Sequence, residues 1–170
     1  MEDVIEREIT VNAGLDRVWD LVTRPGWWVP ADVETPVDRT PGSRTVRESE
    51  KWGRFPVEVV QVDPKTYAAF RWASQFPGED LAEGRTTLIE FFVAQMADAV
   101  KVTVRESGFA GLDAAEEVKQ AGLAGNTDGW RLEMGSLKER AEVAAGAAAD
   151  SGSGAAAGAG SGAGAAQSVE

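Results

Sequence analysis

The stretch from Ser43 to Glu106 alternates apolar and polar residues in short runs, and no segment between these runs has the length of a helix. Alternation with a period of two is typical of a strand with one buried and one wet face. Short connections favour antiparallel pairing, because parallel strands need long crossovers, usually helices. The candidate strands are Arg44–Ser49, Phe55–Val62, Thr66–Ala73, Thr86–Ala94 and Ala99–Glu106.

The segment before these strands predicts one more strand and two short helices. Val4–Val11 alternates in the same way. A helix is expected over Ala13–Val22, with Asn12 as its N-cap and one apolar stripe at helical spacing. Trp27–Val29 precedes a proline and predicts a second helical turn, which we expect to place Trp27 on the surface.

The segment after the strands is helical in pattern. Asp113 is a candidate cap for a short helix through Ala121, and a longer helix is expected over Asn126–Val143. The apolar residues of the longer helix recur at helical spacing and are Trp130, Met134, Leu137 and Ala141. This stripe needs a large apolar surface, and the inner face of the sheet is the available one. The sequence therefore predicts an α+β fold with an antiparallel sheet.

The chain divides into one domain, residues 1–143, and a tail, residues 144–170. Every residue from Gly146 to Ala166 is Gly, Ala or Ser, apart from Asp150. Such a segment has almost no side chain to bury, so it does not offset the entropy cost of ordering its backbone. We expect a disordered Gly/Ala/Ser-rich tail.

Composition excludes several classes of function. The formal net charge of −11 disfavours binding to nucleic acid or to an anionic membrane, since both need clustered Lys and Arg. The chain has no His and no Cys, which excludes Ser–His–Asp and Cys–His chemistry and the usual zinc sites. We expect no metal and no cofactor. The acidic N-terminus and the lack of a 20-residue apolar run indicate a cytoplasmic protein.

Four segments carry motifs that occur together in one known family. They are ITVNAGLDRVWDLVT (Ile9–Thr23), GRFPVEVVQVDPKTYAAFRW (Gly53–Trp72), VKVTVRESGF (Val100–Phe109) and NTDGWRLEMGSLKERAE (Asn126–Glu142). Together they resemble bacterial Hsp90-ATPase-activator-like (AHSA1-type) domains of the SRPBCC, START-like or Bet v 1-like superfamily. The resemblance implies a helix-grip fold, in which a curved antiparallel sheet wraps around a long C-terminal helix and encloses a mostly apolar cavity.

Strand parity and the resemblance together nominate the residues of that cavity. Trp72, Phe91 and Glu106 lie on the apolar parity of their strands, and the resemblance places the cavity beside Trp72 and Trp130. We expect these four residues to bind the ligand. Arg7 lies on the apolar parity of the first strand and is a candidate counter-charge for Glu106. In the alternative arrangement Glu106 lies at the rim of the sheet and Arg7 extends into water.

Three functions follow as hypotheses from the resemblance. The first is binding of a small hydrophobic molecule, with no catalytic residue assigned. The second is an enzyme similar to polyketide cyclases or aromatases, with Glu106 or Tyr67 as acid or base. The third is an interaction module for a protein partner, which an exposed apolar patch near Trp27 and Trp28 would favour. The sequence leaves the oligomeric state open.

Overall fold

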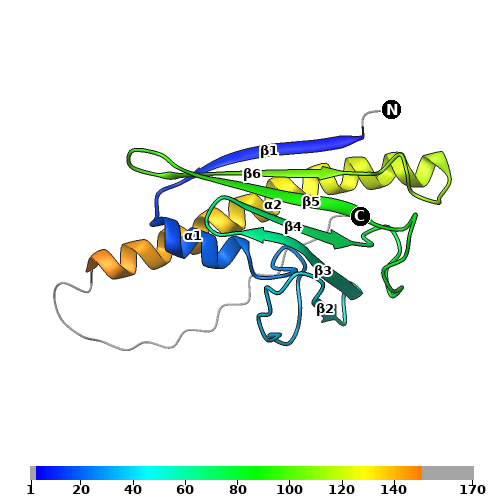
Figure 1. Ribbon diagram of the computed structural model, residues 1–170, viewed down its shortest axis with the longest axis horizontal. Helices are drawn as coiled ribbons and strands as arrows, with labels where there is room; N and C mark the ends of the chain where they lie inside the picture. The colour runs from blue at the N-terminus through cyan, green and yellow to red at the C-terminus, as the bar shows by residue number, and fades with distance from the viewer. Residues whose placement is uncertain (1–2, 151–170) are drawn as a thin grey trace.

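The computed structural model describes residues 3–150, with side chains described through Val143, and shows a six-stranded antiparallel sheet and two helices (Figure 1). The strands follow the order β1-β6-β5-β4-β3-β2 across the sheet. The elements are β1 (Val4–Val11), α1 (Leu15–Val22), β2 (Arg44–Ser49), β3 (Gly53–Asp63), β4 (Tyr67–Trp72), β5 (Thr87–Gln95), β6 (Val100–Ser107) and α2 (Glu116–Asp150). The predicted α+β helix-grip fold is confirmed.

The six strands lie where the alternation predicts them. Their ends differ from the predicted ends by at most two residues. The tight turn between β3 and β4 closes with a hydrogen bond from Thr66 N to Asp63 O (3.2 Å), and Lys65 takes a left-handed φ of 63°. The register between β3 and β4 shifts between Val59 and Gln61, and such a bulge bends a strand.

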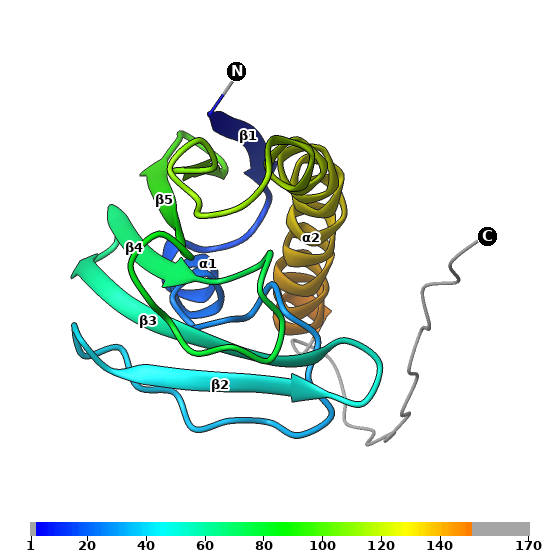
Figure 2. The ribbon, with the colours of Figure 1, turned by 90° about the vertical axis from the view of Figure 1, so that its right-hand side faces the viewer.

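The sheet curves around α2, with β1 and β2 at its two edges (Figure 2). The backbone of α2 comes close to β1 and to α1. Between α2 and the middle of the sheet, large side chains fill the space. The buried inner-face residues of the central strands are Ala68, Phe70, Ile89, Phe91, Val93, Val100, Val102, Val104 and Glu106, which include Phe91 and Glu106 as strand parity predicts.

The C-terminal segment forms one helix, so the prediction of two helices there is wrong. The helix α2 runs without a break from Glu116 to Asp150, through the region between Ala121 and Asn126 where the sequence predicts an interruption. Gly122 lies against the end of the Gln75 side chain there, and a Cβ at this position would require that side chain to move, since it would lie 2.5 Å from Gln75 Cδ. Residues 144–150 continue α2, and the rest of the predicted tail lies outside the described residues, so a disordered tail remains a prediction.

The segment after β1 also differs from its prediction, since α1 is the single helix found in residues 12–43. The N-cap of α1 is Gly14, and Asn12 instead donates its backbone N–H to Glu142 Oε1 at 2.9 Å. Residues 24–29 form two successive turns, closed by Trp27 N to Arg24 O (3.1 Å) and Val29 N to Gly26 O (2.9 Å).

These turns bury Trp27, which the sequence analysis expects on the surface, together with its neighbour Trp28. Trp27 and Trp28 are 7% and 4% exposed. The Trp27 ring lies 5.6 Å from the Phe91 ring, and the Trp28 ring lies 5.8 Å from the Trp130 ring, measured between centroids. The pair therefore fills much of the space between the sheet and α2, and its burial supplies apolar area that a short helix on the surface would not.

We expect Trp27→Ala and Trp130→Ala to lower the free energy of unfolding by similar amounts, about 3–5 kcal/mol each, because both remove a buried aromatic ring. Trp52→Ala is the matched control, since Trp52 is 50% exposed, and it should cost less than about 1 kcal/mol. Urea unfolding measures all three. A loss for Trp27→Ala as small as that for Trp52→Ala would contradict the buried turn.

Candidate functional site

Glu106 is a fully buried carboxylate at the centre of a hydrogen-bond network. Its exposed fraction is 0%, and it lies on the inner face of β6. Oε1 accepts hydrogen bonds from Trp72 Nε1 (2.9 Å) and Thr87 Oγ1 (2.6 Å). Oε2 accepts one from Trp130 Nε1 (2.6 Å), and Asn126 Nδ2 contacts both oxygens at 3.1 and 3.2 Å.

The network joins the sheet to α2. Trp72 in β4 lies opposite Thr87 in β5. Glu106 lies on β6, the next strand of the sheet, opposite Ile89 of β5. Asn126 and Trp130 lie one turn apart on α2, so both point to the sheet. One carboxylate thus receives hydrogen bonds from two strands and a helix, and it fixes how α2 is rotated against the sheet.

The partners of Glu106 are all neutral. Burial raises the pKa of Glu106, and the hydrogen bonds from Thr87, Trp130, Trp72 and Asn126 lower it in part. Three of these partners are N–H groups, which can donate a hydrogen bond but cannot accept one. Each oxygen of Glu106 therefore faces at least one group that requires an acceptor.

Arg7 is not the counter-charge of Glu106. Its side chain is exposed, and it is absent from the hydrogen bonds around the carboxylate. Arg7 thus extends into water, as in the alternative arrangement, but Glu106 is in the interior and not at the rim. Tryptophan and asparagine donors stabilise the carboxylate in place of a cation, and strand parity alone gives no sign of them.

Tyr67 lies on the opposite face of the sheet from α2, so the hypothesis that it acts in the cavity is wrong. Its hydroxyl donates to Glu90 Oε1 at 2.8 Å, and its ring lies 5.2 Å from that of Phe92. Burial, with the hydrogen bond and charge of Glu90, raises the pKa of Tyr67 to about 12. The parity of β4 explains the position, because Tyr67 alternates with the inward-facing Ala68.

A cavity of about 110 Å³ lies above this network, between α2 and β4. Its lining residues are Trp28, Trp72, Asn126, Gly129, Trp130 and Glu133. Two of the four predicted site residues, Trp72 and Trp130, are among them. Glu106 lies behind the lining and orients both indoles, and Phe91 is deeper in the core, with its ring 5.8 Å from that of Trp130.

The cavity is smaller than the resemblance implies. An apolar cavity of about 150 Å³ is large enough for benzene, and the present one is below that size. Trp27 and Trp28 occupy space between the sheet and α2, which the sequence did not predict, since Trp27 was expected on the surface.

Glu133 is a functional candidate that the sequence analysis missed. It is half-buried at the mouth of the cavity, three residues after Trp130 on α2. Burial raises its pKa to about 7, although the positive charge of Arg140 lowers it in part. The helical spacing of Asn126, Trp130 and Glu133 is the sequence signal that could have found it.

Among residues 3–143, no three His, Cys, Asp or Glu side chains are grouped so that they could hold a metal ion. In residues 3–150, no helix combines the length and the apolar character needed to cross a membrane.

The comparisons with known proteins identify a family. The family model described as "Activator of Hsp90 ATPase homolog 1-like protein" matches residues 12–142. No curated protein sequence matches the chain.

Solved structures share the fold at low sequence identity. The MLL2253 protein of Mesorhizobium loti is 18% identical with a TM-score of 0.61, over 80% of this chain and 94% of that one. The Aha1 dimer of Colwellia psychrerythraea is 16% identical with a TM-score of 0.63, over 84% and 98%. DynU16, described as a putative protein in the dynemicin biosynthetic locus, is 24% identical with a TM-score of 0.62, over 85% of this chain and 49% of that one.

We expect Glu106→Gln to destabilise the fold by about 1–3 kcal/mol, the cost of an unsatisfied buried donor. Each carboxylate oxygen contacts an indole N–H, so the amide NH₂ of glutamine would face a donor in either orientation. Glu90→Gln on the outer face is the control, because the amide oxygen can still accept from Tyr67. Urea unfolding at pH 7 compares them, and equal losses would rule out the network as a structural centre.

The raised pKa of Glu133 predicts a pH-dependent stability. The folded protein keeps the Glu133 proton up to about pH 7, whereas the unfolded chain releases it near pH 4.3. The stabilisation is therefore complete below about pH 4.3 and is lost as the pH rises through 7. Compared with Glu133→Gln, the wild type should lose stability between pH 5 and pH 8, measured by urea midpoints. Glu139→Gln, on the exposed side of α2, should retain the wild-type pH profile.

Proposed function

Because the chain belongs to the Activator of Hsp90 ATPase homolog 1-like family, we propose that it binds a small, mostly apolar molecule between α2 and β4. The observation that supports this most directly is the cavity with three tryptophan side chains in its lining. It remains open although the neighbouring core is densely filled with aromatic rings.

The lining is pre-organised for an apolar ligand. Trp72 and Trp130 each use the indole N–H on Glu106, so their rings are held in place before a ligand arrives. Holding side chains in the bound arrangement lowers the entropy cost of association. The ligand we propose contacts the apolar faces of these two rings.

The lining also indicates a hydrogen-bonding group on the ligand. The indole N–H of Trp28 is buried and has no hydrogen-bond partner among the described residues. An unpaired buried donor costs about 1–3 kcal/mol, and a ligand oxygen in the cavity would remove that cost. Glu133 and Asn126 supply further polar groups at the same cavity. We therefore propose a ligand with an apolar body and one oxygen acceptor.

Gly129 keeps the cavity open. A Cβ at this position would have no atom within 4 Å, so the glycine is not required by packing. Glycine inside a helix is unfavourable by about 1 kcal/mol relative to alanine. A side chain longer than that of alanine would extend into the 110 Å³ space, and the glycine at this place is consistent with a binding role.

One observation favours catalysis as a second candidate function. A carboxyl group with a pKa of about 7 is suited to act as general acid or base near neutral pH, and Glu133 has such a pKa at the cavity. The similar structure DynU16 is assigned to a biosynthetic locus. Turnover by the wild type that disappears in Glu133→Gln would show that the protein is an enzyme, of the cyclase-like kind that the resemblance implies.

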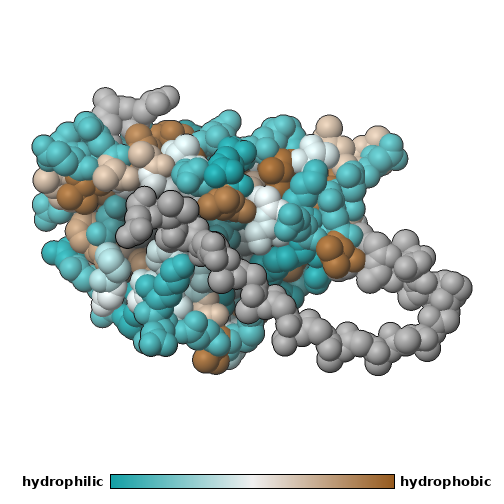
Figure 3. All heavy atoms as spheres, turned by 180° about the vertical axis from the view of Figure 1, so that it is seen from behind, coloured by the Kyte–Doolittle hydropathy of each residue, from teal (hydrophilic) through white to brown (hydrophobic). Residues whose placement is uncertain are grey.

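Binding to a protein partner remains a hypothesis without such an observation. An exposed apolar patch near Trp27 and Trp28, which would favour this hypothesis, is absent, because both side chains are buried. On the side shown in Figure 3, the apolar residues that are coloured lie in small separate groups among hydrophilic ones. A cytoplasmic location likewise remains a prediction from the sequence.

The binding proposal predicts that Gly129→Leu blocks the cavity. 2-Propanol, a neutral molecule smaller than benzene with an apolar body and one oxygen, should shift the Trp28 Nε1–H signal of the wild type in a ¹H–¹⁵N spectrum, and Gly129→Leu should weaken its binding at least about tenfold. Gly125→Leu is the matched control on the same helix. A Cβ at position 125 would also have no atom within 4 Å, but Gly125 is exposed and lies outside the cavity.

The control should bind 2-propanol like the wild type, and both variants should keep the wild-type melting temperature within a few degrees. Absence of 2-propanol binding by the wild type, or equal binding by both leucine variants, would refute the proposal.

A further inference from the structure

A second cavity, of about 270 Å³, lies between β2, the turn after α1 and the C-terminal part of α2. It shares no lining residue with the cavity at Glu133. Its charged and polar lining residues are Arg24, Trp27, Glu34, Thr35, Arg47 and Arg140. Three arginines and one glutamate give this lining a net charge of +2, in a chain whose formal net charge is −11.

Arg47 is held with its guanidinium group partly out of water. Its side chain passes over Gly26, and a Cβ on residue 26 would lie 2.5 Å from Arg47 Cγ. Gly26 also has a left-handed φ of 76°, which favours glycine. Its Nε donates to Val29 O at 3.1 Å. Burial lowers the pKa of Arg47, Glu34 raises it and the nearby charge of Arg140 lowers it. An anion in the cavity would compensate for both the burial and the repulsion.

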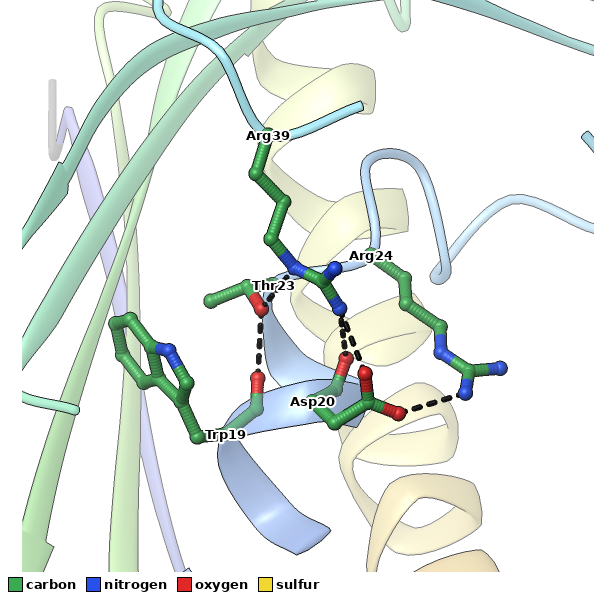
Figure 4. Close-up of polar contacts among 5 residues, drawn as sticks. All are labelled: Trp19, Asp20, Thr23, Arg24 and Arg39. Atoms are coloured by element: carbon green, nitrogen blue, oxygen red, sulfur yellow. Dashed lines mark hydrogen bonds and ion pairs between the residues drawn. The ribbon is translucent and has the colours of Figure 1, made fainter. Parts of the chain in front are cut away.

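Arg24 and Arg140 have unused donors. Arg24 Nη2 donates to Asp20 Oδ2 (2.6 Å), and the other oxygen of Asp20 accepts from Arg39 Nη2 (2.8 Å), as Figure 4 shows. Arg24 Nε, in contrast, is buried and has no hydrogen-bond partner among the described residues. Arg140 makes no hydrogen bond or ion pair with any side chain that the structure describes.

The arrangement around Asp20 fixes Arg24 in place. Burial alone would raise the pKa of Asp20, but the hydrogen bonds and charges of Arg24 and Arg39 outweigh it and lower that pKa. Asp20 therefore remains ionised and holds both guanidinium groups. Arg39 also donates to Thr23 Oγ1 (2.7 Å), which connects the loop before β2 to α1.

Trp27 adds a donor without charge. The side chain is 7% exposed, and its indole Nε1 is buried without a hydrogen-bond partner in residues 3–143. Oxygen acceptors satisfy such a donor, and the cavity that Trp27 lines contains one carboxylate, that of Glu34, which is exposed.

We propose that this cavity binds an oxyanion, a carboxylate or a phosphate group of a small molecule, through Arg24, Arg47 and Arg140 and the indole N–H of Trp27. Arginine forms paired, charge-assisted hydrogen bonds to both kinds of anion. The inference is independent of the apolar cavity, because it uses none of that cavity's lining residues.

Isothermal titration calorimetry of the full chain with inorganic phosphate and, separately, with benzoate tests the proposal. Wild-type protein should bind at least one of the two anions, and benzyl alcohol, the neutral analogue of benzoate, should not bind here. Arg140→Gln should weaken anion binding by roughly tenfold, since it removes a charge-assisted contact. Binding of phosphate alone would assign the site to a phosphate-bearing ligand, and binding of benzoate alone to a carboxylate.

Arg131→Gln is the matched control, because it removes the same charge from an exposed position on α2 outside the cavity. Arg140 is also exposed, but Arg131 lies outside the cavity, so Arg131→Gln should change anion affinity less than about twofold because its charge acts only through water and salt. Glu34→Gln should strengthen binding, because it removes the one negative charge of the lining. Equal weakening by Arg131→Gln and Arg140→Gln would show a general charge effect and would overturn the site.

The indole resonances give a second readout that does not depend on an arginine variant. Anion binding should shift the Trp27 Nε1–H signal in a ¹H–¹⁵N spectrum, with the assignment made from Trp27→Phe. Trp72 and Trp130 donate to Glu106, so their signals should move much less. No heat and no shift with either anion at about ten millimolar and low salt would overturn the proposal.

Discussion

The hydrogen bonds to the buried carboxylate of Glu106 determine how the helix and the sheet fit together. Moving an ionised carboxylate out of water is costly, and several donors are needed to offset the loss. Here β4, β5 and α2 each contribute, and the two donors on α2 are one turn apart. An apolar side chain at position 106 could pack equally well, but it would not select one rotation of α2. The carboxylate thus supplies specificity, and the surrounding aromatic core supplies most of the burial energy.

Four tryptophans near α2 divide into two functional pairs because of this carboxylate. Trp72 and Trp130 use their N–H groups on Glu106. Trp27 and Trp28 have buried N–H groups without partners among the described residues, and each lines a different cavity. Their rings lie 6.0 Å apart and nearly perpendicular, so one aromatic pair separates the two cavities. Buried donors without partners are rare in native proteins, and two that both line cavities are consistent with ligands on either side.

The sequence predicted what depends on local pattern and missed what depends on tertiary contacts. Alternation located every strand, and it correctly put Phe91 and Glu106 on the inner face, because side-chain direction in a strand follows parity. It could not show that Asn126 reaches Glu106 or that Arg24, Arg47 and Arg140 converge, since these contacts join distant segments. Composition was misleading in one respect: a net charge of −11 describes the whole surface and does not exclude a local cluster of cations.

An anion bound in the second cavity, as proposed, would be coupled electrostatically to Glu133 along one face of α2. Glu133 lines the apolar cavity and Arg140 lines the charged one, and the charge of Arg140 lowers the pKa of Glu133. Seven residues of helix separate their Cα atoms by about 10 Å. An anion beside Arg140 would cancel part of that charge, so Glu133 would keep its proton to a higher pH. Linkage then requires that protonation of Glu133 favours the anion by the same factor. Because 10 Å is close to the Debye length at about 0.1 M salt, this coupling is strong only at low ionic strength.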